Sequence, residues 1–144
     1  IEAHAFHVAH AHTDGDAAVD FPGINVFHAG DLLFNNLYPY IDLDSGGSVA
    51  GIIRFQQELL ELTDDETIIL PGHGEIASKA DLRRNLMMIT DSQAPVKLLI
   101  DQGRTIDEVL AANPLSMYHD DYDWAFISTE TFTRMLYRSL TEAE

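Results

Sequence analysis

The chain has 144 residues, of which 46% are hydrophobic, and this is enough for one folded domain or for part of a larger one, which excludes a disordered chain. Its 8 basic and 24 acidic residues give a formal net charge of −16, which repels nucleic-acid phosphate and anionic lipid, so neither nucleic acid nor membrane is expected as a partner. The lack of cysteine excludes disulfides and thiolate ligands, and no apolar run approaches the roughly 18–20 residues of a membrane span.

Three strands are expected in the first part of the chain. Residues 3–11 alternate loosely between apolar and polar side chains, which predicts a strand. Residues 17–21 and 24–27 predict two further strands, and the short Pro-Gly connection between them favours an antiparallel hairpin. Residues 31–47 then form a long loop with several aromatic side chains, and loops of this length in compact domains are usually functional.

A helix and a buried strand are expected next. Residues 48–62 have apolar side chains at helical spacing, with Gln56 as the one polar residue on the apolar face. The apolar run 67–70 predicts a buried strand that ends at Pro71.

Helices are expected over the remainder of the chain. Ser78 and Asp81 form a capping box for a helix that passes Ile89, and a second helical stretch over 95–100 ends at Gly103. Another capping box, of Thr105 and Glu108, begins a short helix that Asn113-Pro114 ends, and a last helix begins at Ser128 or Thr129.

Three short motifs adjoin these strands: HTDGD at 12–16, HAGD at 28–31 and PGHG at 71–74. Imidazoles and carboxylates at the ends of neighbouring strands can converge on one point, and such a convergence is a metal site. Each motif also has an ordinary structural interpretation. A lone histidine is more often structural than a ligand, and aspartate in a turn commonly accepts bonds from backbone N–H groups.

The glycines in two of the motifs favour the metal interpretation. Gly30 lets the backbone bend so that Asp31 can point over the strand ends, and its two carboxylate oxygens can bridge two cations. Two glycines around His73 suit a backbone that passes close to another group and aims the imidazole inward. His10 and His12 begin a pattern that reads His-x-His-x-Asp, but Gly15 stands where a further histidine would follow, so His10 is interpreted as a neighbour and not a ligand.

The order and spacing of the three motifs resemble the second half of a metallo-β-lactamase-fold hydrolase. The resemblance covers residues 1–90, and GRTIDEV at 103–109 resembles the helical extension of one branch of that family. It implies an α/β (α+β) chain that forms the C-terminal half of a four-layer αβ/βα sandwich over residues 1–90, with a helical extension over 91–144 packed on it.

The resemblance also implies a role for each motif. His12 would bind a first metal, Asp31 would bridge two metals and be the catalytic residue, and His73 would bind the second metal. The metals would be zinc, or else iron or manganese, and a metal-bound hydroxide would attack an ester, thioester, lactone or amide of a small-molecule substrate.

The sequence departs from the family in one large respect, because the family's first motif, His-x-His-x-Asp-His, is absent from this chain. Each metal would keep one terminal ligand and the shared Asp31, whereas zinc needs at least three protein ligands. The chain alone is therefore expected to bind metal weakly or not at all. Half a sandwich also leaves a sheet edge and an apolar face to be covered, so we expect either a homodimer or an N-terminal half beyond this chain.

Three hypotheses follow. The first is a fragment of a metal-dependent hydrolase that is catalytically incomplete as given. The second is a non-catalytic dimerising domain that kept the loops and lost the metal, and the third is a small-molecule binding module that uses the aromatic loop 34–40. Because the chain begins at Ile1 and not at Met, the sequence leaves both a cytoplasmic and a periplasmic location open.

Overall fold

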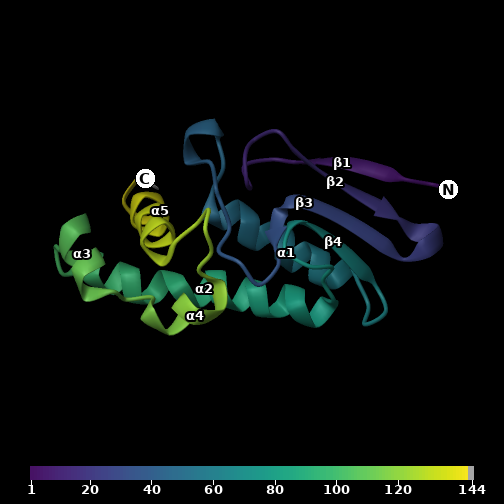
Figure 1. The fold of residues 1–144 in the computed structure, drawn as a ribbon. Helices are drawn as coiled ribbons and strands as arrows, with labels where there is room; N and C mark the ends of the chain where they lie inside the picture. Colours follow the sequence, from purple (N-terminus) through teal and green to yellow (C-terminus); the bar gives the residue numbers. More distant parts are fainter. Residues whose placement is uncertain (143–144) are drawn as a thin grey trace.

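A four-stranded mixed sheet forms one side of the molecule (Figure 1). The computed structural model describes residues 1–142. The strands lie in chain order across the sheet, and they are β1 (His4–Val8), β2 (Asp16–Phe21), β3 (Val26–Phe34) and β4 (Ile68–His73). β2 and β3 pair antiparallel, as the hairpin signal predicts, and β1 also pairs antiparallel with β2, whereas β3 and β4 pair parallel.

The third strand is longer than the sequence predicts. It begins at Val26, after a single 3-10 turn at Pro22–Ile24, and it continues to Phe34, so the loop predicted from residue 31 begins after Phe34. Parallel pairing with β4 explains the extension, because the ladder runs from Val26 opposite Ile68 to Phe34 opposite His73. β4 likewise continues to His73 instead of ending at Pro71 as predicted.

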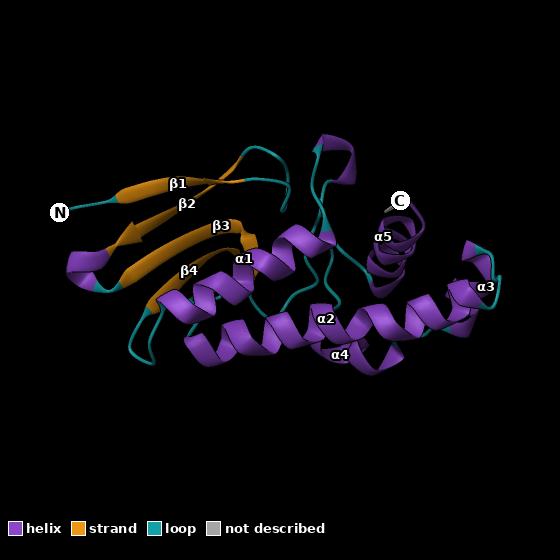
Figure 2. Cartoon of the chain, turned by 180° about the vertical axis from the view of Figure 1, so that it is seen from behind, coloured by secondary structure: helices purple, strands orange, loops and turns teal. Residues whose placement is uncertain are grey.

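Over residues 1–142 five helices accompany the sheet, and Figure 2 shows α1 in front of the sheet with the first half of α2 beside α1. The helices are α1 (Val49–Leu62), α2 (Lys79–Asp101), α3 (Ile106–Ala112), α4 (His119–Tyr122) and α5 (Thr129–Glu142). α1, α3 and α5 follow the sequence prediction, while the single turn of α4 was not predicted. None of the helices over residues 1–142 has the length and apolar content to cross a membrane.

The apolar face of α1 packs on the sheet. Ile52, Phe55 and Leu59 are buried on this face, and the ring of Phe55 lies 6.5 Å from that of Phe27 on β3. Gln56, the polar exception, is buried too, and its Nε2–H donates to the Leu32 carbonyl at 3.0 Å. The side-chain amide thereby supplies a donor at the end of β3.

The second helix is continuous where the sequence predicts two stretches. α2 runs from Lys79 to Asp101 with Pro95 inside it. Proline lacks the N–H that would bond to the residue four positions earlier, which usually breaks or kinks a helix. Burial of Ser92 and Val96 on either side of Pro95 keeps this segment packed against the body of the protein, so tertiary contacts override the local signal.

The capping box at the beginning of α2 is confirmed. Ser78 Oγ accepts from the backbone N–H of Asp81 at 3.2 Å, and Asp81 Oδ2 accepts from the backbone N–H of Ser78 at 2.8 Å. The bond from the Ser78 backbone is the main reason that the pKa of the Asp81 carboxyl lies below its usual value.

Replacing Asp81 with alanine is expected to destabilise the protein by about 1 kcal/mol at neutral pH. The pKa of Asp81 is lowered in the folded state, so its contribution is present above the usual aspartate pKa and is lost as the pH falls through the lowered value. Urea unfolding from pH 7 to pH 3 measures this. The difference in free energy of unfolding between wild type and Asp81→Ala should become smaller as the pH falls. A difference that does not change with pH would contradict the assigned cause.

The second half of α2 packs against α5 and α3 in a helical group distal to the sheet (Figure 1). Phe132 and Leu136 of α5 are buried at its centre. Tyr38, from the loop after β3, enters this group and stacks on Phe132 with ring centroids 4.6 Å apart. The helical group is therefore tied to the sheet by α2 and by the loop that carries Tyr38.

The sheet face opposite α1 carries apolar side chains that remain accessible within residues 1–142. Alternation along the strands places Phe27 and Ile69 on the helix-covered face and Val19, Val26 and Ile68 on the other. Ile68 is 45% exposed, whereas its neighbour Ile69 is fully buried. Accessible apolar side chains on one sheet face favour a further layer over that face.

Candidate functional site

The three residues singled out from the motifs lie together at one edge of the sheet. His12 lies in the loop between β1 and β2, Asp31 lies within β3, and His73 ends β4. His12 Nε2 is 3.7 Å from Asp31 Oδ2, and His73 Nε2 is 3.4 Å from Asp31 Oδ1. Each carboxylate oxygen therefore faces one imidazole. The convergence is as the sequence predicts, and the assignment of these residues as metal ligands stays a prediction.

Backbone geometry at Gly30 and Gly72 brings Asp31 into this position. Gly30 has φ of +54°, a left-handed conformation, and the register of β3 against β4 shifts on both sides of it. A Cβ on Gly72 would lie 2.0 Å from Asp31 Oδ1 and 2.8 Å from the Asp31 nitrogen. The β4 backbone therefore passes directly against Asp31, which is the close approach that the glycines around His73 suggest.

Asp16, for which the sequence favours a role in the turn over direct contact with metal, holds the imidazole of His12. The Asp16 carboxylate accepts from His12 Nδ1–H at 3.1 Å and from the backbone N–H of Thr13 at 2.8 Å. The side chains of His12 and Asp16 are only 15% and 10% exposed. A carboxylate on Nδ1 directs the other nitrogen, Nε2, towards Asp31, which is the usual support of a metal-binding histidine.

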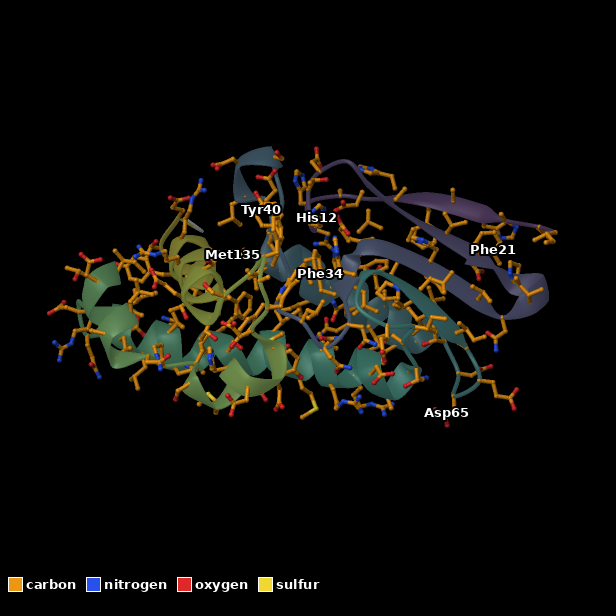
Figure 3. All side chains as sticks on the ribbon, viewed as in Figure 1. His12, Phe21, Phe34, Tyr40, Asp65 and Met135 are labelled. Atoms are coloured by element: carbon orange, nitrogen blue, oxygen red, sulfur yellow. The ribbon has the colours of Figure 1, made fainter. Side chains whose placement is uncertain are left out.

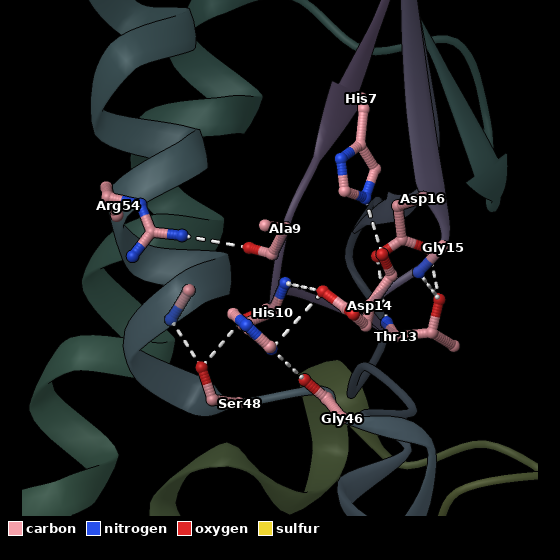
Figure 4. A network of polar contacts seen from close by, with 11 residues as sticks. His7, Ala9, His10, Thr13, Asp14, Gly15, Asp16, Gly46, Ser48 and Arg54 are labelled. Carbon is pink, nitrogen blue, oxygen red and sulfur yellow. Dashed lines mark hydrogen bonds and ion pairs between the residues drawn. The ribbon is translucent and has the colours of Figure 1, made fainter.

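His10 lies outside this group, in a separate network that Figure 4 shows. Its Nδ1 donates to the Gly46 carbonyl at 3.0 Å and lies 3.3 Å from Asp14 Oδ1. Ser48, the N-cap residue of α1, donates its hydroxyl to the His10 carbonyl at 2.6 Å. This network joins the loop after β1 to the beginning of α1, and Asp14 belongs to it and not to the His12 group.

His28 also points to a structural role. The side chain is exposed, and its Nδ1 accepts from the backbone N–H of Gly30 at 3.1 Å. This bond supports the register shift that redirects Asp31.

Aromatic side chains form the rest of the surroundings. A cleft of about 500 Å³ is lined by His12, Asp31, Phe34, Tyr40, His73, Trp124 and Phe126. Figure 3 shows His12, Phe34 and Tyr40 grouped where the sheet meets the helical group. Phe34 stacks on His73 with centroids 4.9 Å apart and planes within 14°. Sequence reasoning missed Trp124 and Phe126, whose one signal was the chain's single tryptophan beside a phenylalanine in a polar segment.

The residues at the site are of types that bind a divalent metal, but they are too few to hold one. Two imidazole nitrogens and a carboxylate are donors that zinc, iron and manganese accept. However, residues 1–142 contain no group of three or more His, Asp or Glu side chains placed to hold a metal ion. The described part of the chain therefore presents an incomplete donor set.

No family model and no curated protein matches the sequence. Comparison with known proteins therefore shows similarity to solved structures alone. A structure of the stereoselective inverting sec-alkylsulfatase Pisa1 from Pseudomonas sp. aligns with a TM-score of 0.66 at 17% identity, over 93% of this chain and 23% of that one. A metallo-β-lactamase from Pontibacter korlensis aligns with a TM-score of 0.52 at 15% identity, over 61% and 41%. The chain thus spans less than half of either protein. These likenesses confirm the expected fold class over part of that fold.

Proposed function

We propose that this chain, which has the fold of the metallo-β-lactamase superfamily over part of its extent, supplies half of the site of a metal-dependent hydrolase. The whole enzyme would cleave an ester, thioester, lactone or amide of a small molecule. Its remaining metal donors would come from a further segment of the same protein, which would also cover the accessible sheet face.

The observation that carries this proposal is the convergence of His12 and His73 on Asp31, with one carboxylate oxygen facing each imidazole. The Asp16 carboxylate accepts from His12 Nδ1–H, and this bond leaves Nε2 of His12 directed towards Asp31. That nitrogen faces Asp31 Oδ2 at 3.7 Å. Imidazole nitrogens and carboxylate oxygens are donors that divalent metals accept, and a carboxylate on the other ring nitrogen is the usual support of a metal-binding histidine.

The residues have distinct parts in the proposed site. Asp31 offers one oxygen towards each histidine, so it can serve two cations at once, and Asp16 is a positioning residue that fixes His12. When bound, divalent metal ions lower the pKa of water to about 7 and polarise the bond to be cleaved. Asp31, His12 and His73 would hold them with donors from outside the chain.

Metal content tests the proposal. The intact protein here means residues 1–144 together with the proposed further segment. Elemental mass spectrometry of this protein should find about two equivalents of zinc, iron or manganese per chain. Residues 1–144 alone should hold less than one equivalent of metal. Their mass in solution, measured alongside, distinguishes a monomer from a dimer. Two equivalents in a dimer of residues 1–144 would show that a second copy completes the site. An intact protein that binds no metal would refute the proposal and favour the non-catalytic dimerising domain.

Replacing Asp16 with asparagine is expected to weaken metal binding by the intact protein by about 10- to 100-fold, because the supporting bond no longer fixes the His12 tautomer. Competition against a chelator of known affinity measures the change. Asp14→Asn is the matched control, since Asp14 lies in the same loop and contacts His10 instead. Equal losses in both variants would mean that the loop and not the His12 contact is responsible.

A second function is favoured by the aromatic lining of the cleft, which also suits a binding module for small apolar molecules without catalysis. Ligand binding that persists after chelation, in a protein that hydrolyses no ester, thioester, lactone or amide, would support this function over the first.

A further inference from the structure

The cleft beside His12, Asp31 and His73 has one polar end and one aromatic end. The aromatic end consists of Phe34, Tyr40, Trp124 and Phe126, which are called the aromatic wall below. No lysine, arginine or glutamate lines this cleft in the part of the chain that the structure describes. Its histidine and aspartate side chains therefore all lie at the proposed reacting end.

The aromatic wall is assembled from three separate parts of the chain. Phe34 ends β3, Tyr40 lies in the loop that follows, and Trp124 and Phe126 lie between α4 and α5. The ring of Trp124 lies 5.6 Å from Phe126 and 6.2 Å from Phe34, and Phe126 lies 6.1 Å from Tyr40. These separations are those of attractive aromatic pairs, so the four rings form one continuous surface.

The segment that carries two of these rings is held in place by hydrogen bonds. Trp124 Nε1–H donates to the Tyr38 carbonyl at 3.0 Å, and the Trp124 backbone N–H donates to the Ile127 carbonyl at 3.2 Å. The Asp123 carboxylate accepts from the Thr129 N–H at 2.7 Å, at the beginning of α5. The indole is thus fixed at its polar edge, and its apolar face remains available to the cleft.

Phe126 is the most exposed member of the wall. It is 65% exposed, whereas Phe34 is buried. When an apolar group covers a large ring that is open to water beside a cleft, apolar surface is buried and the free energy falls. An anionic group would gain nothing comparable at the aromatic wall, because none of the described residues that line the cleft is a lysine or an arginine and the chain as a whole carries −16.

We propose that the aromatic wall is the specificity surface of the site and binds an uncharged apolar group of the substrate, alkyl or aryl, while the bond to be cleaved lies at Asp31 and His73. The second part of this statement rests on the proposed function. A cleft of about 500 Å³ is large enough for a ring or a short alkyl chain beside the reacting group. Trp124 and Phe126 are thereby assigned as specificity-determining residues contributed by the helical group.

The indole N–H of Trp124 gives a direct test, because its NMR signal reports on the wall without any need for metal or turnover. In the ¹⁵N-labelled intact protein, the signal is assigned by its loss in Trp124→Phe. Titration with benzyl alcohol should shift it saturably, and glycerol should not. Phe126→Ala should weaken benzyl alcohol binding by about three- to ten-fold, because it removes one aromatic contact.

Leu98→Ala is the matched control, since Leu98 is 59% exposed on α2 and lies outside the cleft lining. Its benzyl alcohol affinity should equal that of wild type. Equal responses to both alcohols, or the same affinity in Phe126→Ala and wild type, would overturn the assignment of the wall. If the protein binds no metal, the benzyl alcohol titration can still be carried out and still tests the aromatic wall. If the protein binds metal and hydrolyses its substrate but the Trp124 signal does not respond, the proposed function stands and the assignment of the aromatic wall is wrong.

Discussion

Replacing Asp31 with asparagine is expected to lower kcat/KM of the proposed hydrolase by at least about 100-fold, since loss of a supporting partner of a metal ligand already costs about 10- to 100-fold. Asparagine keeps the shape of the side chain but removes the negative charge and one of the two acceptor oxygens. Asp31 faces both histidines, so both halves of the proposed metal pair lose a ligand. The measurement is the rate of ester or thioester hydrolysis together with metal content.

His10→Ala is the control for this prediction. His10 contacts Gly46 and Asp14 and has no contact with Asp31, so its loss should have only a mild effect on kcat/KM. Equal losses from Asp31→Asn and His10→Ala would show that the ligand assignment is wrong.

Replacing Phe132 with alanine is expected to destabilise the protein by about 3–5 kcal/mol, the usual cost of removing a fully buried phenylalanine. Phe132 is fully buried and stacks on Tyr38, so the variant leaves a cavity between α5 and the loop that follows β3. Urea unfolding followed by circular dichroism measures the change in the free energy of unfolding.

Met117→Ala provides the comparison, because Met117 is exposed and its replacement should change the free energy of unfolding by no more than about 0.5 kcal/mol. A loss below about 1 kcal/mol in Phe132→Ala would mean that the site relaxes and that the Tyr38 contact contributes little.

The polar end of the site could be predicted from the sequence because its signals are local. Glycines beside Asp31 and His73 indicate unusual backbone geometry within a few residues of each ligand candidate. The structure bears out both parts of this reasoning, since Gly30 is left-handed and Gly72 lies against Asp31. Capping boxes are equally local, and those of α2 and α3 formed as predicted.

The aromatic end of the site could not be predicted because it depends on contacts between distant segments. Trp124 reaches the cleft through its bond to Tyr38, 86 positions earlier in the chain. The length of β3 depends in the same way on pairing with β4, and the continuity of α2 through Pro95 depends on burial against the body. Neither a propensity nor a short motif contains these contacts. The division of the chain at residue 90 stays a prediction.

The continuity of α2 has a consequence for recombination between relatives of this protein. The first half of α2 packs on α1 and the sheet, and its second half packs on α5. The hydrogen bond between Trp124 and Tyr38 joins the sheet and the helical group at a second place. A chimaera that exchanges the helical group would need a junction inside α2 and would import two of the four rings of the cleft. Stability and substrate preference would therefore be inherited together, and such exchanges should succeed only when residues 34–40 are transferred from the same parent.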